Sequence, residues 1–263
     1  MSDGKKEILL GDCLELMKDI PNGSIDMILC DLPYGTTACK WDTIIPFDKL
    51  WEQYERIIKP NGAIVLTASQ PFTTALIASN YKLFKYELIW DKVCASGALL
   101  AYKRVMKVHE NICIFYKKQC TYNPQYTKRK KEDLRPNKVK TKLLNPCKSW
   151  DGTGQINKHS DKYDDTRVSP KSILTFNKRA AKIMHPTQKP VPLFEYLINT
   201  FTNEGELILD NCAGSGTTAI ACLNTKRQFI VMEKEQKYYD IILKRVGDFN
   251  KNFEPQTIFG NEM

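Results

Sequence analysis

Short apolar runs alternate with amphipathic stretches along most of this 263-residue chain. Runs such as AIVLTA and FIVM are apolar almost throughout, which is typical of parallel strands that are covered on both faces. Strands are predicted at 8–10, 25–30, 63–67, 86–90, 111–116, 206–209 and 228–232. Strands that alternate with helices favour an α/β fold with a doubly wound sheet.

Three amphipathic helices are predicted between and after these strands. The first spans 46–59, with its apolar side chains on one stripe, and it ends at the Pro-Asn-Gly of 60–62. The second follows Pro190, and the third spans 235–249. These helices supply the apolar faces that a two-sided sheet needs.

The net charge of +9 is concentrated in one segment. Residues 117–180 hold 17 Lys or Arg and 6 Asp or Glu, which leaves 22 basic and 24 acidic residues in the rest of the chain. The stretch 117–182 is polar and interrupts the α/β rhythm, so we predict an insertion there. A basic insertion in a near-neutral body indicates a polyanion partner, and a solvated loop is the alternative.

Cysteine and histidine usage argues against a metal site. None of the nine cysteines forms a CxxC pair, and only three histidines are present. We therefore expect reduced thiols and no bound metal. The start of the chain does not resemble a signal peptide, and no apolar run approaches the roughly 18–20 residues of a membrane span, so we expect a cytoplasmic protein.

Two loops carry candidate chemistry. In SIDMILCDLPYG the apolar strand ends in Asp31, and an aromatic ring, Tyr34, follows three positions later. In ELILDNCAGSGTTAIACL a strand ends at Asp210, a glycine-bearing turn follows, and an apolar helix begins at Thr217. The next strand ends in an acid, Glu233.

A strand, a glycine loop, a helix and a strand that ends in an acid form a nucleoside-binding pattern. Gly214 and Gly216 let the backbone approach a ligand where a Cβ atom would block it. The pattern alone also allows a dinucleotide site or a tight turn without a ligand. The phosphate-binding motif GxxxxGK[ST] is absent, which argues against a nucleoside triphosphatase.

DLPY at 31–34 and AGSGTT at 213–218 together resemble the S-adenosylmethionine-dependent methyltransferases that modify exocyclic amino groups of DNA bases. LLGDCLELM at 9–17 and HPTQKPVPLFEYLI at 185–198 resemble two further segments of that family. The order of the motifs, with a basic insertion between them, resembles the β group of these enzymes. Leu32 stands where a proline is common in the family.

The resemblance implies a Rossmann-like methyltransferase fold with a mostly parallel, seven-stranded sheet. It assigns 1–116 to the catalytic half, 117–182 to an inserted target-recognition region and 183–263 to the cofactor-binding half. The implied partner is double-stranded DNA. Members of the family often form dimers, so the resemblance also implies a homodimer. A restriction–modification role is expected, with no endonuclease identifiable from this chain.

The resemblance also implies the catalytic roles. The Asp31 carboxylate and the Leu32 carbonyl accept hydrogen bonds from the target amine, Pro33 stiffens the turn, and Tyr34 stacks on the base. A stacked base cannot reach this loop, so the target is flipped out of the duplex and its nitrogen attacks the methyl group directly.

Cofactor contacts carry over from the family in the same way. The implied contacts are Asp210, Gly214 and Gly216 at the methionine end, Glu233 at the ribose, Asp12 at the adenine amino group, and Thr187 and Lys189 at the carboxylate. Ala213, Ser215 and Thr217 of the glycine loop are also expected to bind the cofactor. Three acids have a structural alternative: Asp12 as a helix N-cap, Asp210 as a cap of the following helix, and Glu233 as a surface charge.

The function predicted from this resemblance is methylation of adenine N6 in duplex DNA. An aspartate at the start of the catalytic motif leans towards adenine, whereas a serine leans towards cytosine N4. The alternatives are a cytosine-N4 enzyme, a catalytically idle DNA-binding protein of the same fold, and a methyltransferase for RNA or a protein amide.

Overall fold

The computed structural model describes residues 5–36, 42–129, 167–178 and 188–253. The chain divides into two compact units. The first comprises 1–123 and 171–263, and the second comprises 124–170. The predicted insertion, 117–182, is wider than the second unit at both ends.

The described residues form the following helices and strands. In chain order they are β1 (Lys6–Leu10), α1 (Cys13–Leu16), η1 (Met17–Asp19), β2 (Ile25–Asp31), α2 (Phe47–Ile57), β3 (Ile58–Ala68), α3 (Phe72–Ser79), β4 (Phe84–Ser96), η2 (Ala98–Leu100), β5 (Lys107–Phe115), β6 (Thr127–Lys128), β7 (Arg167–Val168), β8 (Ile173–Thr175), α4 (Val191–Phe201), β9 (Leu207–Asp210), α5 (Thr217–Asn224), β10 (Gln228–Glu233) and α6 (Gln236–Phe253). Strands and helices coincide with all seven predicted strands and all three predicted helices.

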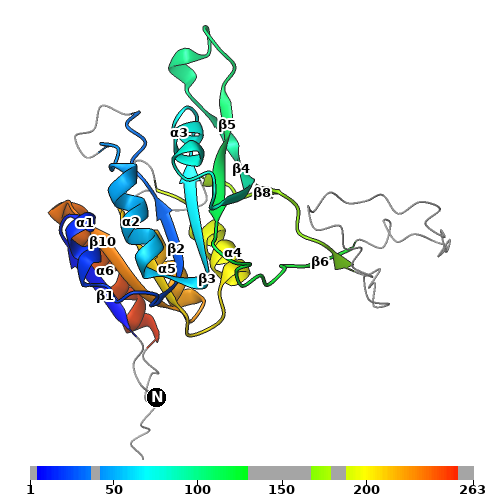
Figure 1. The fold of residues 1–263 in the computed structure, drawn as a ribbon. Helices are drawn as coiled ribbons and strands as arrows, with labels where there is room; N and C mark the ends of the chain where they lie inside the picture. Colours follow the sequence, from blue (N-terminus) through cyan, green and yellow to red (C-terminus); the bar gives the residue numbers. More distant parts are fainter. Residues whose placement is uncertain (1–4, 37–41, 130–166, 179–187, 254–263) are drawn as a thin grey trace, which may run out of the picture. The chain divides into compact units, whose positions relative to one another are not determined.

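Within the described residues the main sheet has eight strands, in the order β1-β10-β9-β2-β3-β5-β4-β8 (Figure 1). Neighbours from β1 to β3 are parallel, β5 is antiparallel to both β3 and β4, and β8 is parallel to β4. The doubly wound α/β fold is therefore confirmed. The eighth strand, β8, comes from the predicted insertion and joins the edge because Leu174 is buried beside Trp90.

Helices cover both faces of this sheet, which explains its apolar strands. On β2, Ile28 and Cys30 pack in the core under α1, α2 and α3. Met27 and Leu29 point to the other face and pack in the core with α4, α5 and α6. Side chains alternate between the two faces of a strand, so a sheet that is covered on both faces needs apolar side chains on both.

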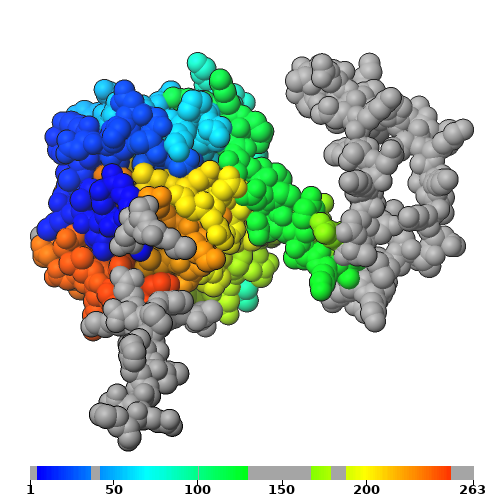
Figure 2. Space-filling view, turned by 90° about the horizontal axis from the view of Figure 1, so that it is seen from below, coloured from blue at the N-terminus to red at the C-terminus, as the bar shows by residue number. Residues whose placement is uncertain are grey.

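The N-terminal and C-terminal parts of the first unit lie side by side. Figure 2 shows the blue N-terminal segment against the orange and red C-terminal segments, in agreement with the parallel pairing of β1 with β10. This pairing brings the loop after β1 next to the loop after β10.

Two local predictions differ from the structure. Helix α2 ends at Ile57, earlier than predicted, because Ile58 is extended and already pairs with Ile25 of β2. Helix α3 was not predicted, since its sequence FTTALIAS has no polar face, although Phe72 and Leu76 anchor it in the core.

The described part of the second unit is a pair of short antiparallel strands, β6 and β7. The Arg167 guanidinium lies 5.8 Å from the centre of the Tyr126 ring. Among the helices of the described ranges, none is long and apolar enough to cross a membrane.

Candidate active site

Strand β2 carries Asp31 to the carboxyl edge of the sheet, between β9 and β3. Its neighbour across the sheet is Thr67, near the end of β3. Leu32 is buried directly after the strand, and the Asp31 side chain is 20% exposed. The predicted catalytic loop therefore begins where two central strands end, which is where open α/β sheets bind ligands.

Three donors converge on the Asp31 carboxylate. The Tyr34 hydroxyl donates to Oδ1 at 2.7 Å, and the Thr67 hydroxyl donates to the same oxygen. The Lys189 ammonium donates to Oδ2 at 2.6 Å. Burial, together with the Asp31 charge, raises the pKa of Tyr34 well above its usual value, so its hydroxyl stays a donor.

The ring of Tyr34 was predicted to stack on the target base. It lies on Phe72 of α3, with ring centroids 5.1 Å apart and an interplanar angle of 27°. The Lys189 ammonium lies 5.6 Å from the centre of the Tyr34 ring. In this arrangement Tyr34 supports the Asp31 carboxylate.

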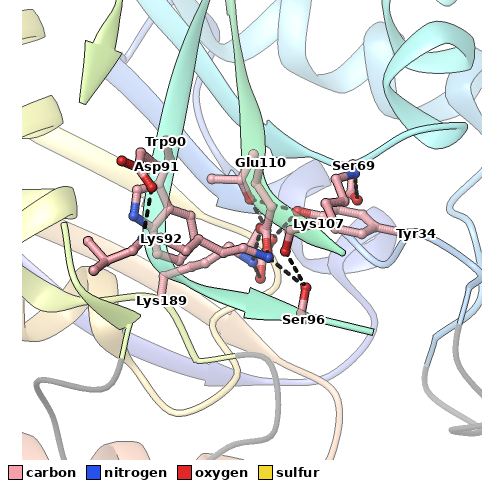
Figure 3. Close-up of polar contacts among 12 residues, drawn as sticks. Tyr34, Ser69, Trp90, Asp91, Lys92, Ser96, Lys107, Glu110 and Lys189 are labelled. Atoms are coloured by element: carbon pink, nitrogen blue, oxygen red, sulfur yellow. Dashed lines mark hydrogen bonds and ion pairs between the residues drawn. The ribbon is translucent and has the colours of Figure 1, made fainter. Parts of the chain in front are cut away.

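A buried network of charges continues from Lys189 into the sheet (Figure 3). Its ammonium is 3.3 Å from Oε2 of Glu110 on β5, and the Lys92 ammonium of β4 is 3.3 Å from Oε1. The lysine side chains are 5% and 3% exposed, so these pairs are shielded from water. Two acids, Asp31 and Glu110, thus pair with two bases, Lys189 and Lys92, at this edge of the sheet.

The network keeps Glu110 and Lys189 charged at neutral pH. Burial acts to raise the pKa of Glu110, but the ammonium groups of Lys189 and Lys92 together hold it below its usual range. Burial acts to lower the pKa of Lys189, and the Asp31 and Glu110 carboxylates together raise it above its usual value. No motif pointed to Glu110 or Lys92, although each is a charge within a strand.

The glycine loop lies between β9 and α5. The Asp210 carboxylate accepts from the Cys212 amide at 3.0 Å and from the Thr218 hydroxyl. The N-cap of α5 is Gly216, and the Asp210 carboxylate accepts no hydrogen bond from the backbone amides of the first turn of α5. The alternative that Asp210 caps this helix is therefore wrong. Burial raises the pKa of Asp210 to about 6.

Glu233 ends β10 and holds the glycine loop. One oxygen accepts from the Gly214 amide at 2.8 Å, and the other accepts from the Glu235 amide at 2.9 Å. Gly214 has a positive φ of 54°, which favours glycine at this close approach. Glu233 is 9% exposed, so the surface-charge alternative is wrong, and burial raises its pKa.

Asp12 is the N-cap of α1, as its structural alternative predicted. Its Oδ1 accepts from the Leu14 amide at 2.9 Å. Its other oxygen is 3.5 Å from the Lys234 ammonium, in a pair that is largely exposed. One oxygen of Asp12 therefore still faces the loop after β10.

These loops enclose one cavity of about 370 Å³. The predicted residues that line it are Asp12, Asp31, Leu32, Pro33, Tyr34, Lys189, Asp210, Ala213, Gly214, Ser215, Thr217 and Glu233. Gly216 does not line the cavity, and Thr187 lies outside the described residues. Sequence reasoning missed the lining residues Ile44 and Tyr238, which lie in no motif, and Phe194, which lies in the segment 185–198 but received no predicted role.

The cavity suits a nucleoside with a cationic tail. Its size falls within the range of about 300–1,000 Å³ for small-molecule sites. Leu32, Ile44 and Phe194 supply apolar walls, and carboxylates lie at the catalytic loop, the glycine loop and the end of β10. S-adenosylmethionine, with its sulfonium and ammonium charges, fits this set of residues.

Comparison with known proteins agrees with this geometry. The N6/N4 family model, described as DNA methylase, matches residues 25–244. The DNA adenine methyltransferase YhdJ of Escherichia coli (strain K12) is 26% identical over 272 residues, which cover 92% of this chain and 82% of YhdJ.

Two solved structures share the fold. The M1.HpyAVI–SAM complex has a TM-score of 0.58 at 22% identity, covering 91% of this chain and 98% of that one. The cytosine-N4-specific PvuII DNA methyltransferase has a TM-score of 0.64 at 16% identity, covering 97% and 89%. Since the family match spans most of the chain, the resemblance seen in the sequence is confirmed. The chain belongs to the N6/N4 family of DNA methylases and is a DNA methyltransferase that uses S-adenosylmethionine.

Proposed function

We propose that this enzyme methylates the N6 amino group of adenine in duplex DNA, after the base has been flipped out of the helix. The observation that carries the proposal is the position of Asp31, which lines the same cavity as the glycine loop. An aspartate at the start of the catalytic motif supports adenine, as does the likeness to a relative named as an adenine methyltransferase.

The hydrogen-bonding capacity of Asp31 fits this role. A carboxylate has about four lone-pair positions, and Tyr34, Thr67 and Lys189 use three of them. One position remains for an N–H group of the target, and the Leu32 carbonyl is the second acceptor we assign. Two acceptors match the two hydrogens of an exocyclic amine.

Hydrogen bonds to both N–H groups make the amine a better nucleophile, because they draw its lone pair out of the ring. Bound S-adenosylmethionine supplies the electrophilic methyl group. Asp31 then stabilises the positive charge that develops on the amine nitrogen, from a carboxylate that is already held in place. Pro33 limits the loop's freedom, so the two acceptors stay aligned.

We assign the cofactor contacts as the family resemblance implies: Asp210, Gly214 and neighbouring loop residues to the methionine end, Glu233 to the ribose and Asp12 to the adenine. That these residues line one cavity supports the assignment. Each Glu233 oxygen accepts one amide N–H and retains a lone pair for a hydroxyl. Lys189 is turned towards Asp31, so we assign it to the catalytic carboxylate and not to the cofactor's carboxylate.

The decisive experiment uses purified protein, isotopically labelled S-adenosylmethionine and unmodified genomic DNA, with mass spectrometry of the released nucleosides. We expect N6-methyladenine. Asp31→Ala is expected to lower the rate at least about a thousandfold while cofactor affinity changes little. Asp48→Ala, an exposed carboxylate on α2, is the matched control and should behave like wild type.

Cytosine N4 is the second candidate, and the fold shared with a cytosine-N4-specific enzyme supports it. Release of N4-methylcytosine in the same assay would replace the adenine assignment. Binding of cofactor without transfer to any DNA would indicate an idle DNA-binding protein, and preferential transfer to RNA would indicate an RNA enzyme.

We further propose that the second unit reads the DNA sequence, and that the enzyme acts in the cytoplasm. Residues 124–170 contain 12 basic and 6 acidic residues, an excess that suits contacts to phosphates.

A further inference from the structure

The turn between β4 and β5 presents large apolar side chains to solvent. Leu99 is 97% exposed, Tyr102 is 100% exposed and Val105 is 92% exposed. All three lie within residues 97–106, which we call the β4–β5 tip, and which extend beyond the sheet (Figure 1). A cluster of exposed apolar side chains on a soluble protein indicates a binding surface.

The tip rises from the edge of the sheet that carries the catalytic loop. Strands β3 and β4 are both antiparallel to β5, so they run in the same direction. The end of β4 therefore lies at the same edge as the ends of β2 and β3, where Asp31 and Thr67 are found (Figure 1).

Polar contacts fix the base of the tip to the active site (Figure 3). The Lys107 ammonium donates to the Ser69 hydroxyl at 2.6 Å, and the Ser96 hydroxyl donates to the Lys107 carbonyl at 3.0 Å. The Lys92 ammonium is 3.1 Å from the Ser96 hydroxyl and 3.3 Å from Glu110, the partner of Lys189. A continuous chain of contacts thus joins the tip to the residue that holds Asp31.

An irregularity in β4 changes the direction of the strand before the tip. The register with β5 shifts between Asp91 and Ser96, and Val93 has a positive φ of 64°, which is rare for a β-branched residue. The Asp91 carboxylate stabilises this turn by accepting from the Val93 amide at 2.9 Å. Such bulges commonly lie beside active sites, where they redirect the chain.

The charges of the tip identify its partner. Residues 97–107 contain Lys103, Arg104 and Lys107 and no acidic residue. Lys103 and Arg104 are exposed beside the apolar side chains. Cations mixed with aromatic and aliphatic side chains suit nucleic acid, because phosphates attract the cations and bases stack on the rings.

We propose that the β4–β5 tip contacts the duplex beside the target base. Lys103 and Arg104 bind backbone phosphates, and Leu99 and Tyr102 pack against the bases that are uncovered when the target leaves the stack. This proposal rests on the proposed function, since it takes duplex DNA as the substrate of the same site.

The test compares two double variants of the full chain. Tyr102→Ala/Lys103→Ala removes an aromatic residue and a cation from the tip. Tyr81→Ala/Lys82→Ala removes the same exposed pair just before β4 begins, at the opposite edge of the sheet. Binding of a labelled duplex of mixed sequence is measured by fluorescence anisotropy over a series of salt concentrations.

The tip variant should weaken duplex binding about tenfold or more and make its dependence on salt less steep by about one unit of log–log slope. Its melting temperature and cofactor affinity should match wild type, because both side chains are exposed. The control variant should bind DNA as wild type does. Leu99→Ala should lower the methylation rate with little change in cofactor affinity.

Wild-type duplex affinity in the tip variant would overturn the proposal, whether or not the protein methylates DNA. Loss of a dimer in sedimentation, with DNA affinity unchanged, would show instead that the tip joins two copies of the chain. Absence of methylation by the wild type would count against the proposed function alone, because the binding assay tests the tip directly.

Discussion

The Asp31 carboxylate accepts hydrogen bonds from two hydroxyl groups and from the Lys189 ammonium. The same ammonium also pairs with the Glu110 carboxylate. Removing a partner from a buried ion pair leaves an uncompensated charge, which is far more destabilising than the loss of an exposed pair. The position of the catalytic carboxylate therefore depends on side chains outside its own motif.

A double-mutant cycle tests this dependence. Lys189→Met is expected to lower the free energy of unfolding by about 3 kcal/mol, since it leaves two largely buried acids with one base. Glu110→Gln should then be less destabilising in the Lys189→Met protein than in wild type, by about 1 kcal/mol or more. Urea denaturation of the four proteins gives both values.

The control for this cycle is Lys18→Met. Lys18 lies 2.6 Å from Glu15, the same distance as Lys189 from Asp31, but this pair is exposed, with Glu15 on α1 and Lys18 on η1. Its loss should change stability by less than about 0.5 kcal/mol. Additive effects of Lys189→Met and Glu110→Gln would mean that the two side chains are not coupled.

Asp210 predicts a pH dependence of stability. Burial raises its pKa from 3.8 to about 6 in the folded state. The folded protein therefore binds this proton more tightly than the unfolded chain, and the associated stability is present at low pH and is lost as pH rises through this interval. The loss amounts to about 3 kcal/mol between about pH 4 and pH 6.

Asp210→Asn lacks this titration. The difference in unfolding free energy between wild type and Asp210→Asn should fall as pH rises to about 6 and stay constant above about pH 7. Chemical denaturation from about pH 4 to pH 8 measures it. Parallel curves for the two proteins would show that Asp210 is not perturbed.

At the scale of elements, the junction of the glycine loop with α5 depends on close packing. Gly216 is the N-cap of α5 with a φ of 80°, and a Cβ atom there would lie 3.0 Å from two side-chain carbons of Ile242 on α6. The predicted role of Gly216 was to admit the cofactor. Its position shows a second role, which is to let the helix approach α6.

Two alanine substitutions separate backbone strain from this contact. Gly205 has a φ of 81° and open space around it, so Gly205→Ala measures strain alone, about 1 kcal/mol. Gly216→Ala should lower the free energy of unfolding by about 2 kcal/mol or more, because the contact with Ile242 adds to the strain. Equal losses in thermal unfolding of the two variants would exclude a role for this contact.

At the scale of the whole molecule, the two units differ in charge. Residues 124–170 have an excess of basic residues, whereas the chain outside 117–180 is near neutral. The described residues that line the cavity all belong to the first unit. Cofactor binding should therefore belong to the first unit, and reading of the DNA sequence to the second.

Replacing residues 124–170 with a short Gly-Ser linker tests this separation. Cofactor affinity should change less than about threefold, whereas methylation of genomic DNA should fall by about a hundredfold or more, because phosphate contacts are lost. Calorimetry and labelled methyl transfer give the two values. Retained methylation at the same sites would assign sequence recognition to the first unit.

The sequence alone determined the α/β class, the order of seven strands and three helices along the chain, and both loops of the site. These features depend on residues that are close in sequence. The spacing of apolar residues indicates which faces of a helix or strand are buried. A strand that ends in Asp31 or Asp210 places that acid at the edge of the sheet. The family resemblance then supplied the cofactor, as the match over 25–244 confirms.

Only the tertiary structure decided which side chains meet Asp31. Lys189 is 158 positions away in sequence, and Glu110 and Lys92 lie in strands whose pattern shows only that they form a sheet. The structure likewise decided that β8 joins the sheet and that the β4–β5 tip rises beside the catalytic loop. Such contacts join residues far apart in the chain, and local periodicity carries no information about pairing between strands.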